Sequence, residues 1–318
     1  MRVAFTCDLH GRSPLYEEAF EYAVNEGAEC ILIGGDLLPT RLRHPYRLVT
    51  GGFEFTDSLR AQFTFIDSFL ARFLEDFSRC HPGILILYVP GNHDWSTALE
   101  HLKDSVHAAT CIHLDSVTAK GIVFTGYGCV TDSSFWVKDF VRRDTDTDRF
   151  IPSRYALTST REGVTVSPEG AYAALRPSIG EELASLSRGD PAKTICVFHC
   201  PPYATGLDTL YTGRPIGSRS ITEYIRRAKP LVSLHGHIHE APYMSGFFRT
   251  AIGPTLAVNP GHHPRRLHAV IFDTDDPTSS LTHSVFGTGP VDRTEFDRAK
   301  DRCARMVKGF FMKNVLMK

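Results

Sequence analysis

Seven side chains of types that commonly bind metal ions stand just after apolar stretches of this chain. In chain order they are Asp8, His10, Asp36, Asn92, His199, His237 and His239. Histidine nitrogens and carboxylate oxygens together bind ions such as Mn, Fe and Zn, and an asparagine oxygen adds a neutral donor. One such residue would mean little, because Asp and Asn also form turns. Five apolar runs that all end in this way predict a shared metal site.

The types of these residues also indicate the chemistry. Two carboxylates do not neutralise two divalent cations, so the site would stay positively charged and would attract a phosphate group. Two ions about 3.5–4 Å apart can hold a bridging hydroxide and stabilise both the attacking and the leaving oxygen of a displacement. We therefore expect two divalent metal ions, and these ligands do not select between Mn, Fe and Zn.

The apolar runs in the first half of the chain predict an α/β fold. Short β-rich runs at residues 3–7, 30–33 and 84–89 alternate with amphipathic stretches, which is the pattern of strand–helix–strand units. Because the runs are continuously apolar, we expect the strands to be covered on both faces. In such sheets ligands gather outside the carboxyl ends of the strands, so residues distant in the chain converge there.

The second half of the chain carries two more runs of this kind and then a group of shorter ones. Residues 194–198 end at His199, and residues 231–234 end just before the histidine-rich stretch 235–239. Four shorter strand candidates follow, separated by turn residues, for which we expect antiparallel pairing: 247–252, 255–258, 267–272 and 281–286.

Five short motifs contain the candidate ligands. They are Asp8-Leu9-His10, Gly35-Asp36, Gly91-Asn92-His93-Asp94, His199 and Gly236-His237-Ile238-His239. Their order resembles the signature of the calcineurin-like metallophosphoesterases of the bacterial, dinuclear type. Gly-Asn-His-Asp and Gly-His-Ile-His together make the resemblance specific, whereas Gly-Asp alone has no weight. The resemblance implies an α/β fold in which two mixed β-sheets pack as a sandwich flanked by helices.

Carried over by position, the resemblance also implies a role for each site residue. The two metal ions would be held by Asp8, His10 and His239 on one side and by Asn92, His199 and His237 on the other. Asp36 would bridge the two ions. His93 would lie beside the phosphate, where it would stabilise the transition state or protonate the leaving oxygen. Asp94 would orient His93 by fixing the tautomer of its imidazole.

The function that this implies is hydrolysis of a small phosphomonoester or phosphodiester by a metal-bridging hydroxide. A non-catalytic metal-binding scaffold of the same fold is the alternative, but such a protein would be expected to lose a ligand or the equivalent of His93. A nuclease would use the same chemistry on a different substrate. The formal net charge of −1 gives no sign of the basic groove that nucleic acid requires.

The resemblance and the composition together suggest one main domain, residues 1–290, followed by an amphipathic helix at 291–318. We expect this helix to pack on its own domain, with an oligomer contact as the alternative. Two stretches, 41–64 and 131–168, read as loop-like insertions. The arginines and aspartates of the second stretch predict a solvated loop whose charges neutralise one another.

The remaining features are those of an ordinary soluble protein. Of 318 residues, 42% are hydrophobic and 22% charged, and no apolar run approaches the length of a membrane helix. The start of the chain lacks the features of a signal peptide, and the 8 cysteines include no C-x-x-C pair, so we expect a reducing, cytoplasmic location. His235, His262 and His263 are assigned structural roles in preference to ligand or substrate contacts.

Overall fold

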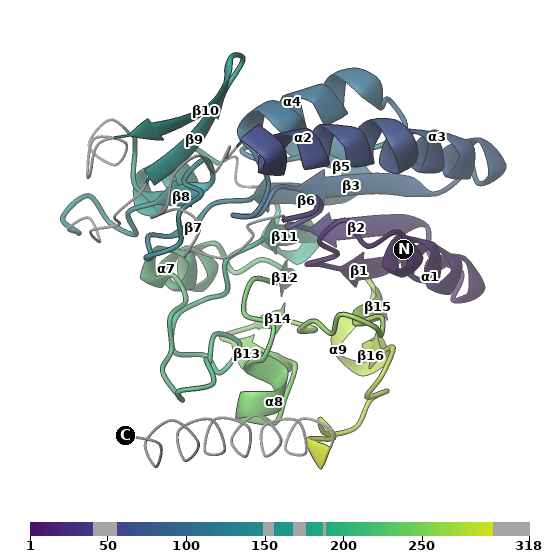
Figure 1. Cartoon of the computed structure of the whole chain (residues 1–318). Helices are drawn as coiled ribbons and strands as arrows, with labels where there is room; N and C mark the ends of the chain where they lie inside the picture. Colours follow the sequence, from purple (N-terminus) through teal and green to yellow (C-terminus); the bar gives the residue numbers. More distant parts are fainter. Residues whose placement is uncertain (41–55, 149–155, 168–175, 187–188, 295–318) are drawn as a thin grey trace, which may run out of the picture.

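The computed structural model describes residues 1–40, 56–148, 156–167, 176–186 and 189–294, and these form two six-stranded sheets with helices on their outer faces (Figure 1). The predicted α/β sandwich of two mixed sheets is therefore confirmed. The helix expected at 291–318 falls almost entirely outside the described residues, which end at residue 294.

The first sheet contains the three strands expected in the first half of the chain. Its order is β16-β15-β1-β2-β3-β4. β1, β2 and β3 run parallel, and β15 pairs antiparallel with β1. The bounds are β1 Arg2–Thr6, β2 Cys30–Gly34, β3 Leu85–Val89, β4 Thr110–Cys111, β15 Ala269–Asp273 and β16 Thr282–His283.

The second sheet has the order β13-β14-β12-β11-β6-β5. β11 lies parallel to both β6 and β12, and β12 also pairs parallel with β14. Antiparallel pairing in this sheet is confined to its ends, in the β13–β14 and β5–β6 pairs. The bounds are β5 Ser116–Ala119, β6 Ile122–Tyr127, β11 Thr194–Phe198, β12 Val232–Leu234, β13 Arg249–Ile252 and β14 Thr255–Val258.

Side chains on alternate faces of each strand build two separate layers of core. In β1, Val3 and Phe5 belong to the apolar layer between the two sheets, whereas Ala4 faces the helices. β11 shows the same division, with Val197 between the sheets and Phe198 on the helical side. Both faces of the strands are thus buried, as the continuous apolar runs predicted.

The helices cover the outer faces of the sandwich. Those of the first sheet are α1 Ser13–Asn25, α2 Thr56–Phe65, a π-helical turn Ile66–Leu70, α3 Ala71–Cys80 and α4 Ser96–Ser105. The second sheet is covered by α6 Ile179–Ser185 and α7 Arg219–Ala228. Shorter helical segments are the 3-10 turn Pro191–Lys193, α8 Ala241–Ser245 and α9 Pro277–Ser280. None of the helices in the described ranges has the length and apolar character needed to span a membrane.

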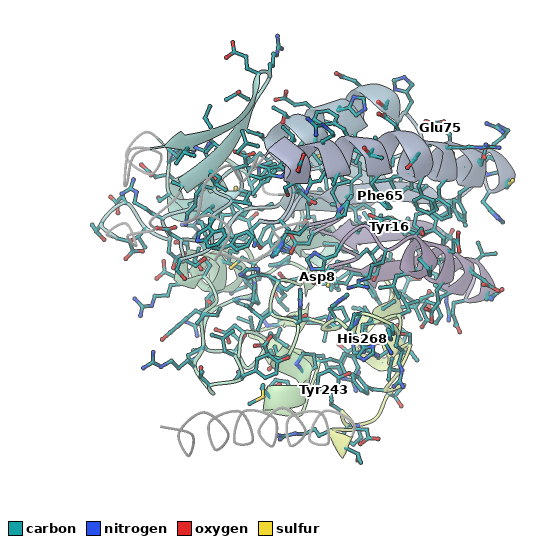
Figure 2. All side chains as sticks on the ribbon, viewed as in Figure 1. Asp8, Tyr16, Phe65, Glu75, Tyr243 and His268 are labelled. Atoms are coloured by element: carbon teal, nitrogen blue, oxygen red, sulfur yellow. The ribbon has the colours of Figure 1, made fainter. Side chains whose placement is uncertain are left out.

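Helix α1 follows the loop that carries the first candidate ligands, Asp8 and His10, and leads to β2. It buries Leu15, Tyr16, Ala19, Phe20 and Ala23, which share one helical face. Tyr16 packs against Phe65 of α2, with ring centroids 5.9 Å apart (Figure 2). The Tyr16 hydroxyl donates a hydrogen bond to the carbonyl oxygen of Leu37 at 2.9 Å, directly after β2.

The expectation that residues 41–64 form a loop is wrong for the part that the structure describes. Helix α2 begins at Thr56, and residues 41–55 lie outside the described residues. Gln62 of α2 is fully buried, donates to the carbonyl oxygens of His93 (2.8 Å) and Pro39 (3.3 Å), and accepts from the backbone N–H of Trp95 (2.9 Å). These partners are distant in sequence, so local patterning could not reveal them.

The expectation of a solvated loop in residues 131–168 is wrong at Arg142 and Asp144, whereas Arg149 and Arg154 lie outside the described residues. The stretch contains parts of the β7–β8 pair, Val130–Thr131 and Val141–Arg142, and the hairpin β9 Ala156–Thr160 and β10 Gly163–Ser167. Arg142 donates to the carboxylate of Glu182 at 3.0 Å with a side chain that is only 12% exposed. Asp144 accepts from the backbone N–H of Arg219 at 2.8 Å, at the start of α7.

Substitution of the buried Gln62 tests how much the hydrogen bonds between α2 and the loops around it contribute to stability. Gln62→Ala leaves the N–H of Trp95 and the carbonyl oxygen of His93 without this partner, so we expect the free energy of unfolding to fall by about 1–3 kcal/mol. Urea denaturation followed by circular dichroism measures the change. Thr64→Ala, an exposed position of the same helix, should stay within about 0.5 kcal/mol of the wild type. Equal effects of the two substitutions would contradict this view.

Candidate metal centre

The loops after β1 and β2 run side by side and bring the first three candidate ligands together. The backbone N–H of Asp8 donates to the carbonyl oxygen of Gly35 at 2.9 Å, and that of His10 donates to the carbonyl oxygen of Asp36 at 2.8 Å. These hydrogen bonds continue the pairing of β1 with β2 beyond the strands. Asp8, His10 and Asp36 therefore emerge at one edge of the sheet.

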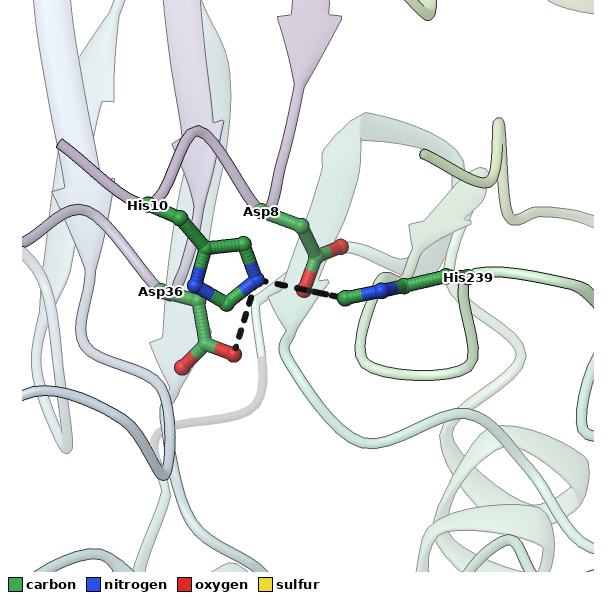
Figure 3. A group of neighbouring side chains, drawn as sticks. All are labelled: Asp8, His10, Asp36 and His239. Carbon is green, nitrogen blue, oxygen red and sulfur yellow. Dashed lines mark hydrogen bonds and ion pairs between the residues drawn. The ribbon is translucent and has the colours of Figure 1, made fainter. Parts of the chain in front are cut away.

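Four side chains form a cluster at this edge. Asp8, His10, Asp36 and His239 each present one ligand atom, and these atoms all lie within 4.8 Å of one another (Figure 3). The Nε2 atoms of His10 and His239 are 3.3 Å apart, and the Nε2 of His239 lies 3.2 Å from Oδ1 of Asp8. Two facing imidazole nitrogens and two carboxylates are a donor set that suits a divalent cation.

The other three predicted ligands, Asn92, His199 and His237, lie on the side of Oδ1 of Asp36. The Nε2 of His199 is 3.5 Å from Oδ1 of Asp36 and 3.3 Å from Oδ1 of Asn92. The rings of His199 and His237 are 5.3 Å apart. The Nδ1 of His199 donates to the carbonyl oxygen of Gly34 at 2.7 Å, which leaves Nε2 toward the site. All seven predicted ligands thus gather in one place.

Four of these seven residues adopt a backbone conformation that side chains other than glycine rarely take. The φ angles are 58° at Asp8, 47° at His10, 52° at Asp36 and 67° at His237. Such conformations cost about 1–3 kcal/mol each and persist where the surroundings hold them in place. At Asp8 and His237 a direct contact does so, because the N–H of His237 donates to both oxygens of Asp8, at 3.2 and 3.1 Å.

The glycines of two motifs are required by close approach to these ligands. A Cβ atom on Gly91 would lie 2.2 Å from Oδ1 of Asp36 and 2.7 Å from Nε2 of His199. On Gly236 it would lie 2.6 Å from Oδ2 of Asp8. Any side chain at either position would displace a candidate ligand, which gives a physical reason for glycine in both motifs.

The charge states of the cluster are set by burial and by the neighbouring groups. Burial alone would raise the pKa of Asp8, but the adjacent His239 lowers it below its ordinary value. The pKa of Asp36 is likewise held low by His93 and His199 against its own burial. Burial lowers the pKa of His10 to about 4 and, helped by His199, that of His237 to about 3. Ionised carboxylates and neutral imidazoles are the states that bind metal ions.

His199 and His239 differ from His10 and His237. Burial opposes a charge on both rings, but Asp8 outweighs this effect at His239 and raises its pKa, and Asp36 does the same at His199, whose pKa rises to about 9. Without metal ions we therefore expect His199 to carry a second ring proton, at Nε2, at neutral pH, and this positive charge would partly balance the two carboxylates. A metal ion at Nε2 would take the place of that proton, so ion binding here is expected to release it.

The expected contact between Asp94 and the ring of His93 is wrong. In the described structure the carboxylate of Asp94 accepts hydrogen bonds from the backbone N–H groups of Leu38 (2.8 Å), Gly91 (2.9 Å) and Leu37 (3.2 Å). Thr40 holds His93 instead, with Oγ1 2.7 Å from Nδ1 of the ring. Asp94 thus joins the loop after β2 to the loop after β3, which positions Asp36 and Asn92 relative to each other.

His93 itself lies at the border of the cluster. Its Nε2 is 4.0 Å from Oδ2 of Asp36, its ring centroid is 4.9 Å from that of His10, and its side chain is 26% exposed. Phe135 packs against the ring at a centroid distance of 4.5 Å. This position beside the candidate ligands, rather than among them, agrees with the place that the motif implied.

The sequence prediction missed one neighbour of the cluster and preferred a structural role for another. Phe135 belongs to the stretch predicted to be a solvated loop, where nothing indicated a contact with His93. His262 was assigned a structural role, yet its ring lies 4.8 Å from that of His239 and 5.5 Å from that of His10. The structural role predicted for His235 agrees with its surroundings, since this buried ring contacts Ser233 and the carbonyl oxygens of Phe198 and Cys200.

A two-sheet sandwich whose strand ends gather histidines, carboxylates and an asparagine defines the class of metal-dependent phosphoesterases. The sequence model of the calcineurin-like phosphoesterases matches residues 1–241, so the chain belongs to this family. It is accordingly a hydrolase of phosphate ester bonds.

A solved structure agrees with this fold. The protein TT1561 of Thermus thermophilus superposes with a TM-score of 0.56 at 16% identity, over 89% of this chain and 97% of its own. A dimetal phosphatase from Danio rerio is 13% identical over 85% of this chain and 92% of its own, and it superposes less closely, with a TM-score of 0.42. No protein of curated function matches the sequence significantly.

The close approach at Gly91 can be tested directly. Gly91→Ala places a methyl group against Asp36 and His199, so we expect loss of most bound metal and a free energy of unfolding lower by about 1–3 kcal/mol. Elemental analysis and thermal melting measure the two effects. Gly83→Ala is the matched control, because a Cβ at this exposed glycine would meet nothing within 4 Å. Metal binding that survives in Gly91→Ala would contradict the geometry described here.

Proposed function

We propose that this protein holds two divalent ions side by side and uses them to hydrolyse a phosphomonoester or a phosphodiester. The observation that supports a pair of ions is the orientation of Asp36. One of its oxygens, Oδ2, faces Nε2 of His10 at 3.8 Å, whereas Oδ1 faces Nε2 of His199 at 3.5 Å. A buried carboxylate whose two oxygens face two separate groups of donors suits a bridge between ions.

In this proposal each ion has its own donors besides Asp36. The first would be held by Asp8, His10 and His239, and the second by Asn92, His199 and His237. When bound, such ions would activate a water molecule and neutralise the charge that develops on the phosphate group. Mn, Fe and Zn all suit these donors, and metal supply would decide among them.

His93 is the residue best placed to act on the substrate. Its Nε2 faces the cluster, while Nδ1 is engaged by Thr40 on the other side of the ring. A hydrogen bond from Nε2 would stabilise charge on a phosphate oxygen, or a proton held there would pass to the leaving oxygen. Thr40 and Phe135 would keep the ring in the orientation that either role requires.

The non-catalytic scaffold is disfavoured by the same geometry. All seven candidate ligands and His93 are present, and they converge, so no element of the site has been lost. For its location we propose the cytoplasm, which the free thiols of the seven described cysteines support.

The first test addresses the pair of ions and the reaction together. The metal-loaded wild type should contain about two ions per chain by elemental analysis and should hydrolyse a mono-aryl or bis-aryl phosphate with added Mn²⁺. Asp36→Asn should weaken the binding of both ions, because both sites lose a charged ligand. The metal content should therefore fall well below about one ion per chain. The choice between the two aryl substrates decides between monoesterase and diesterase.

Asp67→Asn is the control for this substitution, since the Asp67 carboxylate is 61% exposed and lies on the outer helices. It should leave metal content and turnover unchanged. Loss of a single ion in Asp36→Asn, with the other bound normally, would show that Asp36 does not bridge. A folded, fully loaded wild type without turnover on either substrate would favour the scaffold.

A second test separates His93 from the ligands. His93→Ala should lower kcat by about 10²–10⁴-fold, the range typical of a lost acid or electrostatic group, while metal content stays near that of the wild type. His107→Ala, at an exposed histidine whose backbone N–H bonds to Glu75 of α3, should leave kcat unchanged. If His93→Ala releases metal, the residue is a ligand and its proposed role is wrong.

A further inference from the structure

His262 contributes an imidazole to the site from a part of the chain that the family match does not reach. The match ends at residue 241, and His262 lies beyond it, in the segment that connects β14 to β15. Its ring contacts both histidines of the first ligand set, at centroid distances of 4.8 Å from His239 and 5.5 Å from His10. The residue is only partly buried, so part of its surface remains open to solvent.

The loop that carries His262 is held in place by dedicated polar contacts. The buried side chain of Asn259 donates to the carbonyl oxygens of Gly236 (3.3 Å) and Ile238 (3.2 Å) and accepts from the N–H of Gly261 (2.9 Å). The backbone N–H of His262 donates to the carbonyl oxygen of His239 at 3.2 Å. The loop is thus fastened to the segment that supplies His237 and His239.

Two buried histidines support this loop through Pro260. Nδ1 of His268 and Nε2 of His283 both lie within hydrogen-bond distance of the carbonyl oxygen of Pro260, at 2.9 and 3.0 Å. The other ring nitrogen of His268 is 3.2 Å from the hydroxyl of Tyr243 (Figure 2). These two contacts hold the chain two residues before His262 against buried side chains, which restricts where His262 can lie.

The geometry distinguishes His262 from the ligands proposed for the first ion. The ligand atoms of Asp8, His10, Asp36 and His239 share one cluster within 4.8 Å, and His262 is not part of it. Like His93, it contacts the ring of His10 without joining that cluster. Both residues therefore border the ring of His10 from outside the cluster, His93 on the side of Phe135 and His262 on the side of His239.

We propose that His262 is a second substrate-contacting histidine, whose imidazole donates a hydrogen bond to an oxygen of the bound phosphate group. The proposal rests on the proposed function, because it requires a phosphate group at the ions. Its ligand is any phosphate-bearing substrate or product, including inorganic phosphate. The bond would position the phosphate on the side of His239, whereas His93 acts from the side of Phe135.

The test measures phosphate binding separately from turnover. In metal-loaded His262→Ala we expect unchanged metal content and thermal stability, and a Kd for inorganic phosphate, by titration calorimetry, raised about 10–100-fold, as for a lost hydrogen bond to a charged group. KM for an aryl phosphate should rise with it. His262→Gln, which retains an N–H donor, should recover part of the affinity. His263→Ala, the adjacent position, should bind phosphate as the wild type does.

Three outcomes would overturn the proposal. Loss of an ion in His262→Ala would make the residue a metal ligand. Unchanged phosphate affinity and KM would leave it with a packing role alone. A wild type that binds no ions would remove the basis of both proposals. By contrast, a wild type that binds ions and phosphate but hydrolyses no ester contradicts only the proposed function, and the phosphate affinity of the His262 variants still decides the role of this residue.

Discussion

The burial of the Asp36 carboxylate is the constraint on which the rest of the site depends. This side chain is 1% exposed, and an ionised carboxylate at such a position is strongly destabilising unless charges and donors surround it. The backbone N–H of His93 supplies one hydrogen bond, at 2.8 Å, and the rings of His10 and His199 supply nearby nitrogens. Each of these residues follows a different strand, so the environment of one carboxylate fixes the relative positions of β1, β2, β3 and β11.

The same constraint accounts for the strained backbone around the site. Strand ends point in directions set by the sheets, and the side chains must turn from these directions toward one centre. Left-handed conformations at Asp8, His10 and Asp36 provide the turn, and glycine at 91 leaves room for Asp36. Asp94 then fastens the loops after β2 and β3 through three backbone hydrogen bonds. The buried sheets supply the rigidity that makes such strain tolerable.

The ligands could be predicted from the sequence because each stands at the end of an apolar strand, and both strand and motif are local patterns. The residues that surround the ligands could not be predicted in this way. Asp94 is adjacent to His93 in sequence, but its carboxylate bonds to backbone N–H groups instead of the ring of His93. Thr40 makes the contact with that ring that was expected of Asp94. Phe135 and Gln62 reach the site from stretches that read as loops. Their roles depend on the packing of distant elements, which neither periodicity nor motif spacing records.

This difference separates two layers of the site. The donors for the ions come from motifs that can be recognised in many chains, and they lie within residues 1–241, the part that the family shares. Phe135 and His262 stand outside those motifs and contact the rings of His93, His10 and His239, and in the proposed function they would face the substrate rather than the ions. A phosphate group is common to every substrate of the class, so the ions cannot distinguish one ester from another. In the proposed function, discrimination must therefore come from groups that would contact the rest of the ester, such as the ring of Phe135 beside His93, whereas His262 would contact the shared phosphate group.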